Sequence, residues 1–222
     1  MMRALVLNLL TAPPHAEILA AMPPASVSLI VAHPRPSSLC HAIADAVTRA
    51  LRDAGLAVLC HDLYAEGFDP VMRAKEALSR VSIDPLVEAH CAEIAAAAGI
   101  VLIHPNWWSG PPAILKGWAD RVLRPGVAYG FSGADANKGA PTGLLKARAV
   151  LVFATANMPR EVEHKLLGDP LETLWKKSVF AQCGVHTYRQ RVFAPVANAT
   201  PAQCAAWLEE AARVACEAFA CA

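Results

Sequence analysis

Two adjacent tryptophans, Trp107 and Trp108, stand where a flat ligand would bind. They belong to the segment Pro105-Asn106-Trp107-Trp108-Ser109, which follows an apolar run at residues 99–103. Such a run predicts a short strand buried on both faces, and in open parallel sheets ligands bind at loops leaving the carboxyl ends of strands. The tryptophans offer an apolar wall for a flat ligand. A Trp pair also packs well in a core, so the rest of the chain has to decide between these interpretations.

Two further loops have polar residues directly after apolar runs. Residues 33–40 follow the run 27–32 and bring His33, Ser38, Leu39 and Cys40 to the start of a predicted helix. Hydroxyls at a helix N-terminus can form an anion site, although the local sequence by itself favours a capped helix without a ligand. Thr155, Ala156 and Asn157 follow the run 149–153 in the same way. The sequence thus predicts three ligand-facing loops.

The elements that must position these loops form an alternating series. Predicted strands at 27–32, 56–63, 100–104, 149–153 and 185–193 alternate with segments of helical periodicity. This alternation predicts an α/β fold with a doubly wound, five-stranded parallel sheet. In the flavodoxin-like strand order 2-1-3-4-5, the first and third strands are neighbours and their loops converge. The chain has neither GxGxxG after its first strand nor GxxxxGK[ST], so a dinucleotide Rossmann site and a P-loop are not supported.

Composition narrows the class of protein further. The chain has 222 residues, 55% of them hydrophobic and 18% charged, which predicts a folded domain. A formal net charge of +1 gives no basic field for nucleic acid, and no apolar run is long enough to cross a bilayer. Seven cysteines without a CxxC pair predict reduced thiols in the cytoplasm. The neighbours Cys60-His61-Asp62 and His90-Cys91 do not favour a metal site, because adjacent strand residues point to opposite faces.

The chain divides into an N-terminal extension, residues 1–25, and one domain, residues 26–222. The extension is rich in Ala and Pro. We expect it to be poorly ordered, or to reflect a start codon assigned too far upstream, and the sequence does not separate these. Residues 132–143 are rich in Gly, Ala and Asn and predict a mobile loop.

Three motifs resemble the flavin-dependent NAD(P)H quinone reductases of the flavodoxin-like fold, in their bacterial branch. The first runs from Pro105 to Phe131 around PPAILKGWADRV. The others are VAHPRPSSLCHAI, at the end of the first strand, and GDPLETLWKKSVFAQCGV, which begins at Gly168. Together the resemblance covers residues 27 to 215.

The resemblance implies a hydride transfer from NADPH or NADH, through a bound flavin, to a quinone or similar acceptor. FMN is the expected flavin, with FAD as the alternative. By position, the residues implied to hold it are His33, Ser38, Leu39, Cys40, Pro105, Asn106, Trp107, Trp108, Ser109, Thr155, Ala156 and Asn157. Tyr129 and Phe131 match an aromatic pair that reaches over the partner subunit's active site in the family, which implies a homodimer and a substrate contact.

The candidates for a catalytic role are Trp108, Tyr129 and His164. His164 is out of register with the family's charge-transfer residues, because the stretch 160–168 departs from the family's pattern. Cys40 replaces a frequent Asn, which leaves a backbone contact there. Two alternatives stay open: a flavin-binding regulatory subunit that associates peripherally with a potassium efflux protein, and an azo or nitro reductase.

Overall fold

The computed structural model describes residues 26–79, 82, 84–131 and 141–219. Five parallel strands form its sheet in the order β2-β1-β3-β6-β7. This confirms the predicted order 2-1-3-4-5, because two short strands outside this sheet, β4 (Tyr129–Gly130) and β5 (Thr142–Gly143), take the intervening numbers. The five strands are β1 (Ser26–Val31), β2 (Ala57–Asp62), β3 (Gly99–Pro105), β6 (Ala149–Thr155) and β7 (Thr187–Phe193).

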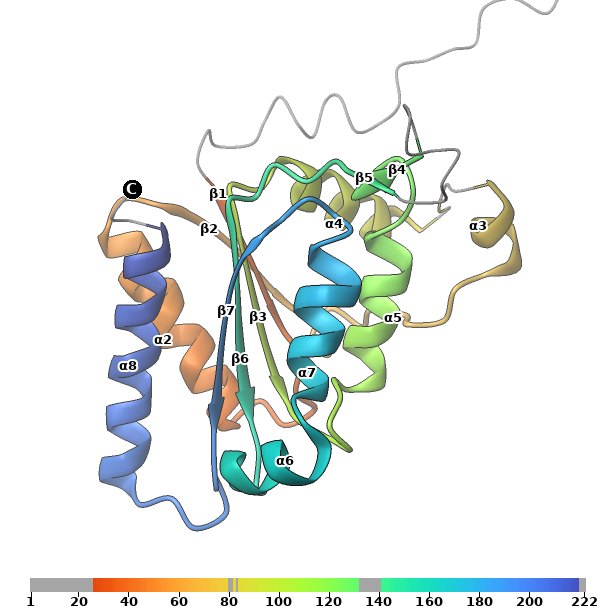
Figure 1. Cartoon of the computed structure of the whole chain (residues 1–222). Coiled ribbons are helices and arrows are strands. Elements are labelled where there is room, and N and C mark those ends of the chain that lie inside the picture. Colours follow the sequence, from red (N-terminus) through yellow and green to blue (C-terminus); the bar gives the residue numbers. More distant parts are fainter. Residues whose placement is uncertain (1–25, 80–81, 83, 132–140, 220–222) are drawn as a thin grey trace, which may run out of the picture.

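Helices cover both faces of the sheet (Figure 1). One face carries α2 (Leu39–Asp53) and α8 (Pro201–Phe219). The other carries α4 (Pro85–Ala96), α5 (Ala113–Val122), α7 (Pro170–Glu172) and the π-helix η2 (Thr173–Phe180). The central strands β3 and β6 are buried along their whole length, as their continuous apolar runs predict.

Local sequence sets where the helices begin. Ser38 caps α2, and its hydroxyl accepts a hydrogen bond from the backbone N–H of His41 at 3.4 Å. Thr200 caps α8 by accepting from the backbone N–H of Gln203 at 3.2 Å. Each cap satisfies an amide that the first helical turn leaves without a partner.

A glycine sets the position of α5. A Cβ atom at Gly117 would lie 2.3 Å from the carbonyl oxygen of Pro70. The helix therefore approaches the segment after β2 more closely than any other residue type at this position permits.

Three parts of the chain differ from the sequence-based expectation. The segment from Asp169 to Cys183 is a short α-helix followed by a π-helix instead of one regular α-helix. Residues 160–167 form a further helix, α6 (Arg160–Leu167). The antiparallel pair β4 (Tyr129–Gly130) and β5 (Thr142–Gly143) was not predicted.

The extension at 1–25 and most of the predicted loop at 132–143 lie outside the described residues. Within the ranges that the structure describes, no helix combines the length and apolar character needed to span a membrane.

Candidate functional site

The three predicted loops converge at the carboxyl ends of β1, β3 and β6. The ring centroids of His33 and Trp107 lie 6.1 Å apart, so the first loop lies against the second. The Cys40 thiol lies 3.3 Å from the Thr155 hydroxyl, which joins the first to the third. The backbone N–H of Asn106 donates to the Thr155 carbonyl at 2.7 Å, which joins the second to the third. The site therefore forms where the strand order predicts it.

The second loop is a tight two-residue turn with Trp108 at its tip. Trp107 and Gly110 exchange two backbone hydrogen bonds of 2.9 and 3.0 Å. The residues between them, Trp108 and Ser109, have φ values of 53° and 58°. Two successive left-handed residues define a type I′ turn, for which Asn-Gly is the preferred pair. Each non-glycine residue in this conformation costs about 1–2 kcal/mol, so other contacts must hold the loop.

Glu163 of α6 supplies such contacts. Its Oε1 atom accepts from Asn106 Nδ2 at 2.8 Å and from Ser109 Oγ at 3.0 Å. The residue is only 4% exposed. Hydrogen bonds to charged groups contribute about 1.5–3 kcal/mol each, enough to offset the strain of the turn.

His104 stabilises the start of the same loop from the buried side. It is fully buried, and the indole N–H of Trp175 donates to its Nε2 at 3.1 Å. Indole is only a donor, so the His104 proton must sit on Nδ1, which lies 2.9 Å from the Pro105 carbonyl oxygen and donates to it. Burial lowers the pKa of His104 to about 4, against a weaker opposing effect of that hydrogen bond. His104 is therefore neutral at pH 7 and fixes the Pro105 carbonyl.

A cavity of about 770 Å³ opens between the second loop, the third loop and α6, and no residue of the first loop lines it. Trp108, fully solvent-exposed at 103%, stands at its wall, so this residue is not part of the core. The Oδ1 atom of Asn106 is buried and has no hydrogen-bond partner. The cavity is lined by Asn106, Trp108, Ser109, Ala156, Asn157, Met158, Glu163, Leu167 and Pro170.

These features fit a flavin. The cavity offers an apolar wall for a flat ring system, and the unsatisfied Asn106 carbonyl oxygen suits the N–H donor on the polar edge of an isoalloxazine.

In the first loop, backbone amides rather than side chains are the groups that fit a phosphate. The Ser38 hydroxyl lies 2.8 Å from His41 Nδ1, and His41 Nε2 lies 2.9 Å from Asp62, so the Ser38 side chain is bonded inward. Cys40 is fully buried, and burial raises the pKa of its thiol to about 11. It is therefore a neutral thiol beside Thr155. The amide groups that open α2 at Leu39 remain the natural donors to an anion.

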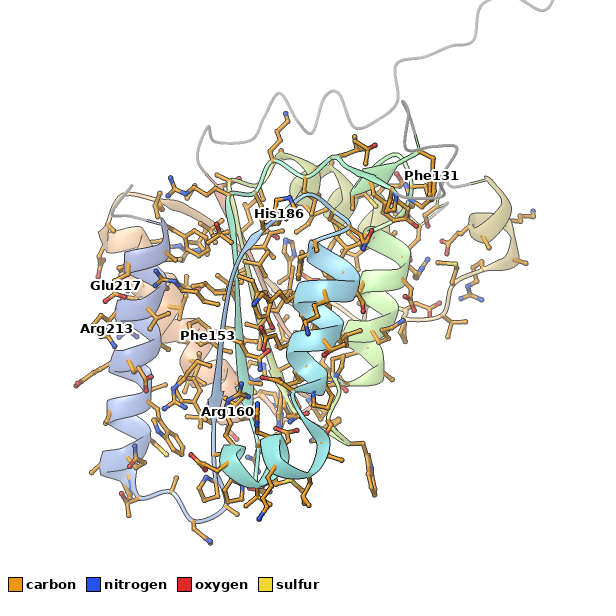
Figure 2. The ribbon with its side chains drawn as sticks, viewed as in Figure 1. Phe131, Phe153, Arg160, His186, Arg213 and Glu217 are labelled. Carbon is orange, nitrogen blue, oxygen red and sulfur yellow. The ribbon has the colours of Figure 1, made fainter. Side chains whose placement is uncertain are left out.

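Tyr129 and Phe131 lie at the other end of the sheet. Their rings pack edge to face with centroids 5.8 Å apart. Phe131 lies beside β4, whereas Arg160, the first residue of α6, lies at the opposite end of the molecule (Figure 2). One chain therefore does not bring this aromatic pair to Trp108.

His164 does not line the cavity. It is exposed on α6, while its neighbour Glu163 turns inward. Sequence reasoning missed both Glu163 and His104. Glu163 lies in a charged stretch typical of a surface, and His104 ends an apolar run, so neither position has a local signal of its role.

A second polar cluster joins the end of β2 to α4. His61 Nδ1 lies 2.7 Å from Glu66, and His61 Nε2 lies 2.6 Å from Glu93. His90 Nε2 lies 3.2 Å from Glu66, and its Nδ1 accepts from the indole N–H of Trp118 at 2.9 Å. His61, Glu66 and His90 are close enough together to offer three metal ligands. However, the Trp118 bond places the His90 proton on Nε2, which removes the lone pair that a metal would need there.

The parallel sheet, its two helical layers and the loops at its switch point define a doubly wound α/β protein. The chain belongs to the family of the flavodoxin-like fold, whose profile matches residues 25–215.

Similar proteins agree with this assignment. An NAD(P)H oxidoreductase of Haemophilus influenzae is 30% identical over 174 residues, covering 76% of this chain and 83% of the relative. The NAD(P)H oxidoreductase YcaK of Escherichia coli is 36% identical over 108 residues, and that match spans 47% of this chain and only 55% of YcaK.

Solved structures show the same fold. Smu.1420 from Streptococcus mutans has a TM-score of 0.72 at 25% identity, covering 86% of this chain and 98% of that one. The NAD(P)H:quinone oxidoreductase from Methanothermobacter marburgensis has a TM-score of 0.76 at 22% identity, with 86% and 97% covered.

Proposed function

We propose that this protein is a flavin-dependent NAD(P)H oxidoreductase that passes a hydride to a quinone or a similar flat acceptor. The observation that carries the proposal is the cavity at the switch point, with exposed Trp108 at its wall and with Asn106, whose buried carbonyl oxygen has no hydrogen-bond partner, among its lining residues. The names of the relatives as NAD(P)H oxidoreductases support the same class of reaction.

A bound flavin supplies the hydride chemistry, and the protein supplies position and electrostatics. Asn106 would accept from the polar edge of the ring, and the Leu39 amide would donate to the phosphate. Trp108 would present an apolar face on which nicotinamide and acceptor bind in turn. The left-handed turn keeps this side chain outside the core, so its face stays available to both.

FMN is the flavin we propose, with FAD as the alternative, because the motifs resemble the bacterial branch of the quinone reductases. Mass spectrometry of the released cofactor distinguishes the two. The buried free thiols of Cys40, Cys91 and Cys183 suit a reducing compartment, which supports a cytoplasmic location. Rates with NADH and NADPH would identify the donor.

We also propose a homodimer in which each partner completes the other's site. Tyr129 and Phe131 lie far from the cavity of their own chain, and Phe131 is 51% exposed. Around the cavity, Leu166 and Leu167 of α6 are 66% and 54% exposed. A two-fold axis would bring these two apolar surfaces together. Sedimentation at several concentrations tests this, and a monomer with full turnover would contradict it.

The decisive experiment is the visible spectrum of the purified protein, followed by anaerobic addition of NADPH and NADH. A bound flavin that bleaches and then recovers with a quinone is the expected result. A colourless protein that also fails to take up FMN or FAD would refute the proposal. A panel of azo and nitro compounds tests the alternative acceptors, and copurification with a membrane protein tests the alternative of a potassium efflux regulator.

A further inference from the structure

We propose that Glu163 is the positioning residue of the cavity loop and that its charge sets the reduction potential of the bound flavin. The positioning role stands without the proposed function, whereas the effect of the charge on the flavin rests on it. The residue touches the loop from α6, lines the cavity and is 4% exposed.

The first part concerns the shape of the loop. Glu163 Oε1 accepts two hydrogen bonds, from Asn106 Nδ2 at 2.8 Å and from Ser109 Oγ at 3.0 Å. These two residues stand on either side of the tryptophans in the loop. Ser109 is one of the two left-handed residues of the turn. A single oxygen atom thus bridges the residue that enters the turn and a residue that must stay in an unfavourable conformation.

The same bond decides which Asn106 atom faces the ligand. Because the Nδ2 group donates to Glu163, the Oδ1 atom is the one left buried without a partner. Glu163 therefore fixes the orientation of the Asn106 amide and leaves its Oδ1 atom as the unpaired acceptor beside the cavity lining. Without the carboxylate, this amide could rotate and leave its donor unpaired instead.

The helix that carries Glu163 is itself anchored. The Arg160 guanidinium at the start of α6 forms an ion pair with Asp169, just beyond the helix end. Asp169 also accepts from Gln190 of β7 at 3.1 Å and from the backbone N–H of Glu172 at 3.0 Å. These bonds tie α6 to the sheet edge, so the Glu163 carboxylate has a fixed position.

The amphipathic pattern of α6 is inverted. Val162, Leu166 and Leu167 are exposed at 44%, 66% and 54%, whereas Glu163 is buried. Burying a carboxylate costs free energy unless it is hydrogen-bonded, and folding alone would favour the opposite orientation of this helix. The contacts with Asn106 and Ser109 account for the inward position.

The second part concerns charge. Transfer of a hydride brings two electrons and one proton, so the loaded site gains one negative charge. A carboxylate beside that site repels the added charge, more strongly in a partly buried cavity than in water. Glu163 should therefore lower the midpoint potential and make the reduced protein a stronger hydride donor.

Three variants separate the two parts. Glu163→Gln keeps a carbonyl oxygen for both donors and removes the charge. Glu163→Ala removes the acceptor as well. Glu161→Gln is the matched control, because it makes the same charge change at an exposed position of the same helix. The measurements are amide hydrogen exchange of the loop 105–110 without flavin, FMN affinity, and the midpoint potential of the FMN-loaded proteins.

We expect Glu163→Ala to speed exchange in the loop and to weaken FMN binding, each by about tenfold or more. Glu163→Gln keeps an acceptor, so it should change both by less than Glu163→Ala does, and it should shift the midpoint potential upward; Glu161→Gln should leave all three unchanged. Equal potentials for the two Gln variants would overturn the charge role, and unchanged loop exchange in Glu163→Ala would overturn the positioning role. If the wild type takes up neither FMN nor FAD, the proposed function fails, while the exchange measurement still tests Glu163.

Discussion

Protonation of His61 should make the stability of this protein depend on pH between neutral and alkaline conditions. The ring has a carboxylate on each nitrogen, Glu66 at 2.7 Å and Glu93 at 2.6 Å. Burial by itself lowers the pKa of His61, but the hydrogen bonds and negative charges of these two residues outweigh it and raise the pKa to about 9. Burial by itself raises the pKa of Glu66, but the hydrogen bonds and positive charges of His61 and His90 outweigh it and lower the pKa to about 2.

The size of the effect follows from the change in His61. A rise in pKa from 6.5 to about 9 corresponds to about 3 kcal/mol of stabilisation, at about 1.4 kcal/mol per tenfold change. The His61 side chain is 14% exposed, so solvent screens this interaction only weakly. Because the pKa is higher in the folded than in the unfolded state, the stabilisation is fully present below pH 6.5 and is lost as the pH rises to about 9.

The assay is urea denaturation of wild type and His61→Gln at about pH 6.0, 7.5 and 9.5, which lie below, within and above the range from 6.5 to about 9 in which the stabilisation is lost. The free-energy gap between the two proteins should be about 2–3 kcal/mol at the lowest pH and close to zero at the highest. Exposed His186 provides the control variant His186→Gln, whose gap should not follow this course. A His61→Gln gap that is the same at all three pH values would refute the charged-imidazole argument.

Three further substitutions test other parts of the structure. Gly117→Ala would place a Cβ atom 2.3 Å from the Pro70 oxygen, so we expect about 1–3 kcal/mol of destabilisation, seen as a lower Tm, in spite of alanine's better helix propensity. Trp118→Phe removes the donor to buried His90 and should cost about 1–3 kcal/mol in urea denaturation; an unchanged midpoint would contradict the assigned tautomer. Trp108→Ala should change the unfolding free energy by less than about 0.5 kcal/mol, because the side chain is fully exposed, while lowering quinone turnover. Full turnover with full flavin content in Trp108→Ala would contradict its place in the site.

The three central strands could be predicted because each contains a continuous apolar run. Residues 29–32, 100–103 and 149–153 are apolar without interruption, as strands buried on both faces must be, and the structure places them side by side in β1, β3 and β6. The same patterns predicted which loops meet, and the bond between Asn106 and Thr155 confirms it.

Helix details were less predictable. The segment after Asp169 has apolar residues at helical spacing, but its hydrogen bonds widen into the π-helix Thr173–Phe180. Trp175 lies within it and donates to buried His104. A local widening of a helix depends on such tertiary contacts, and no periodicity in the sequence encodes it.

The cavity loop shows why the polar support of a site is harder to predict than its place. A two-residue turn with both residues left-handed favours Asn-Gly, yet this chain has Trp108-Ser109 there. Local preference and fold thus disagree, which is typical of functional positions, where strain is offset by contacts from elsewhere. Those contacts come from Trp175, which donates to His104 behind the loop, and from Glu163, 54 residues beyond Ser109. Because they exist only after the sheet has brought distant segments together, the sequence indicates where a ligand would bind but not which residues hold the loop that binds it.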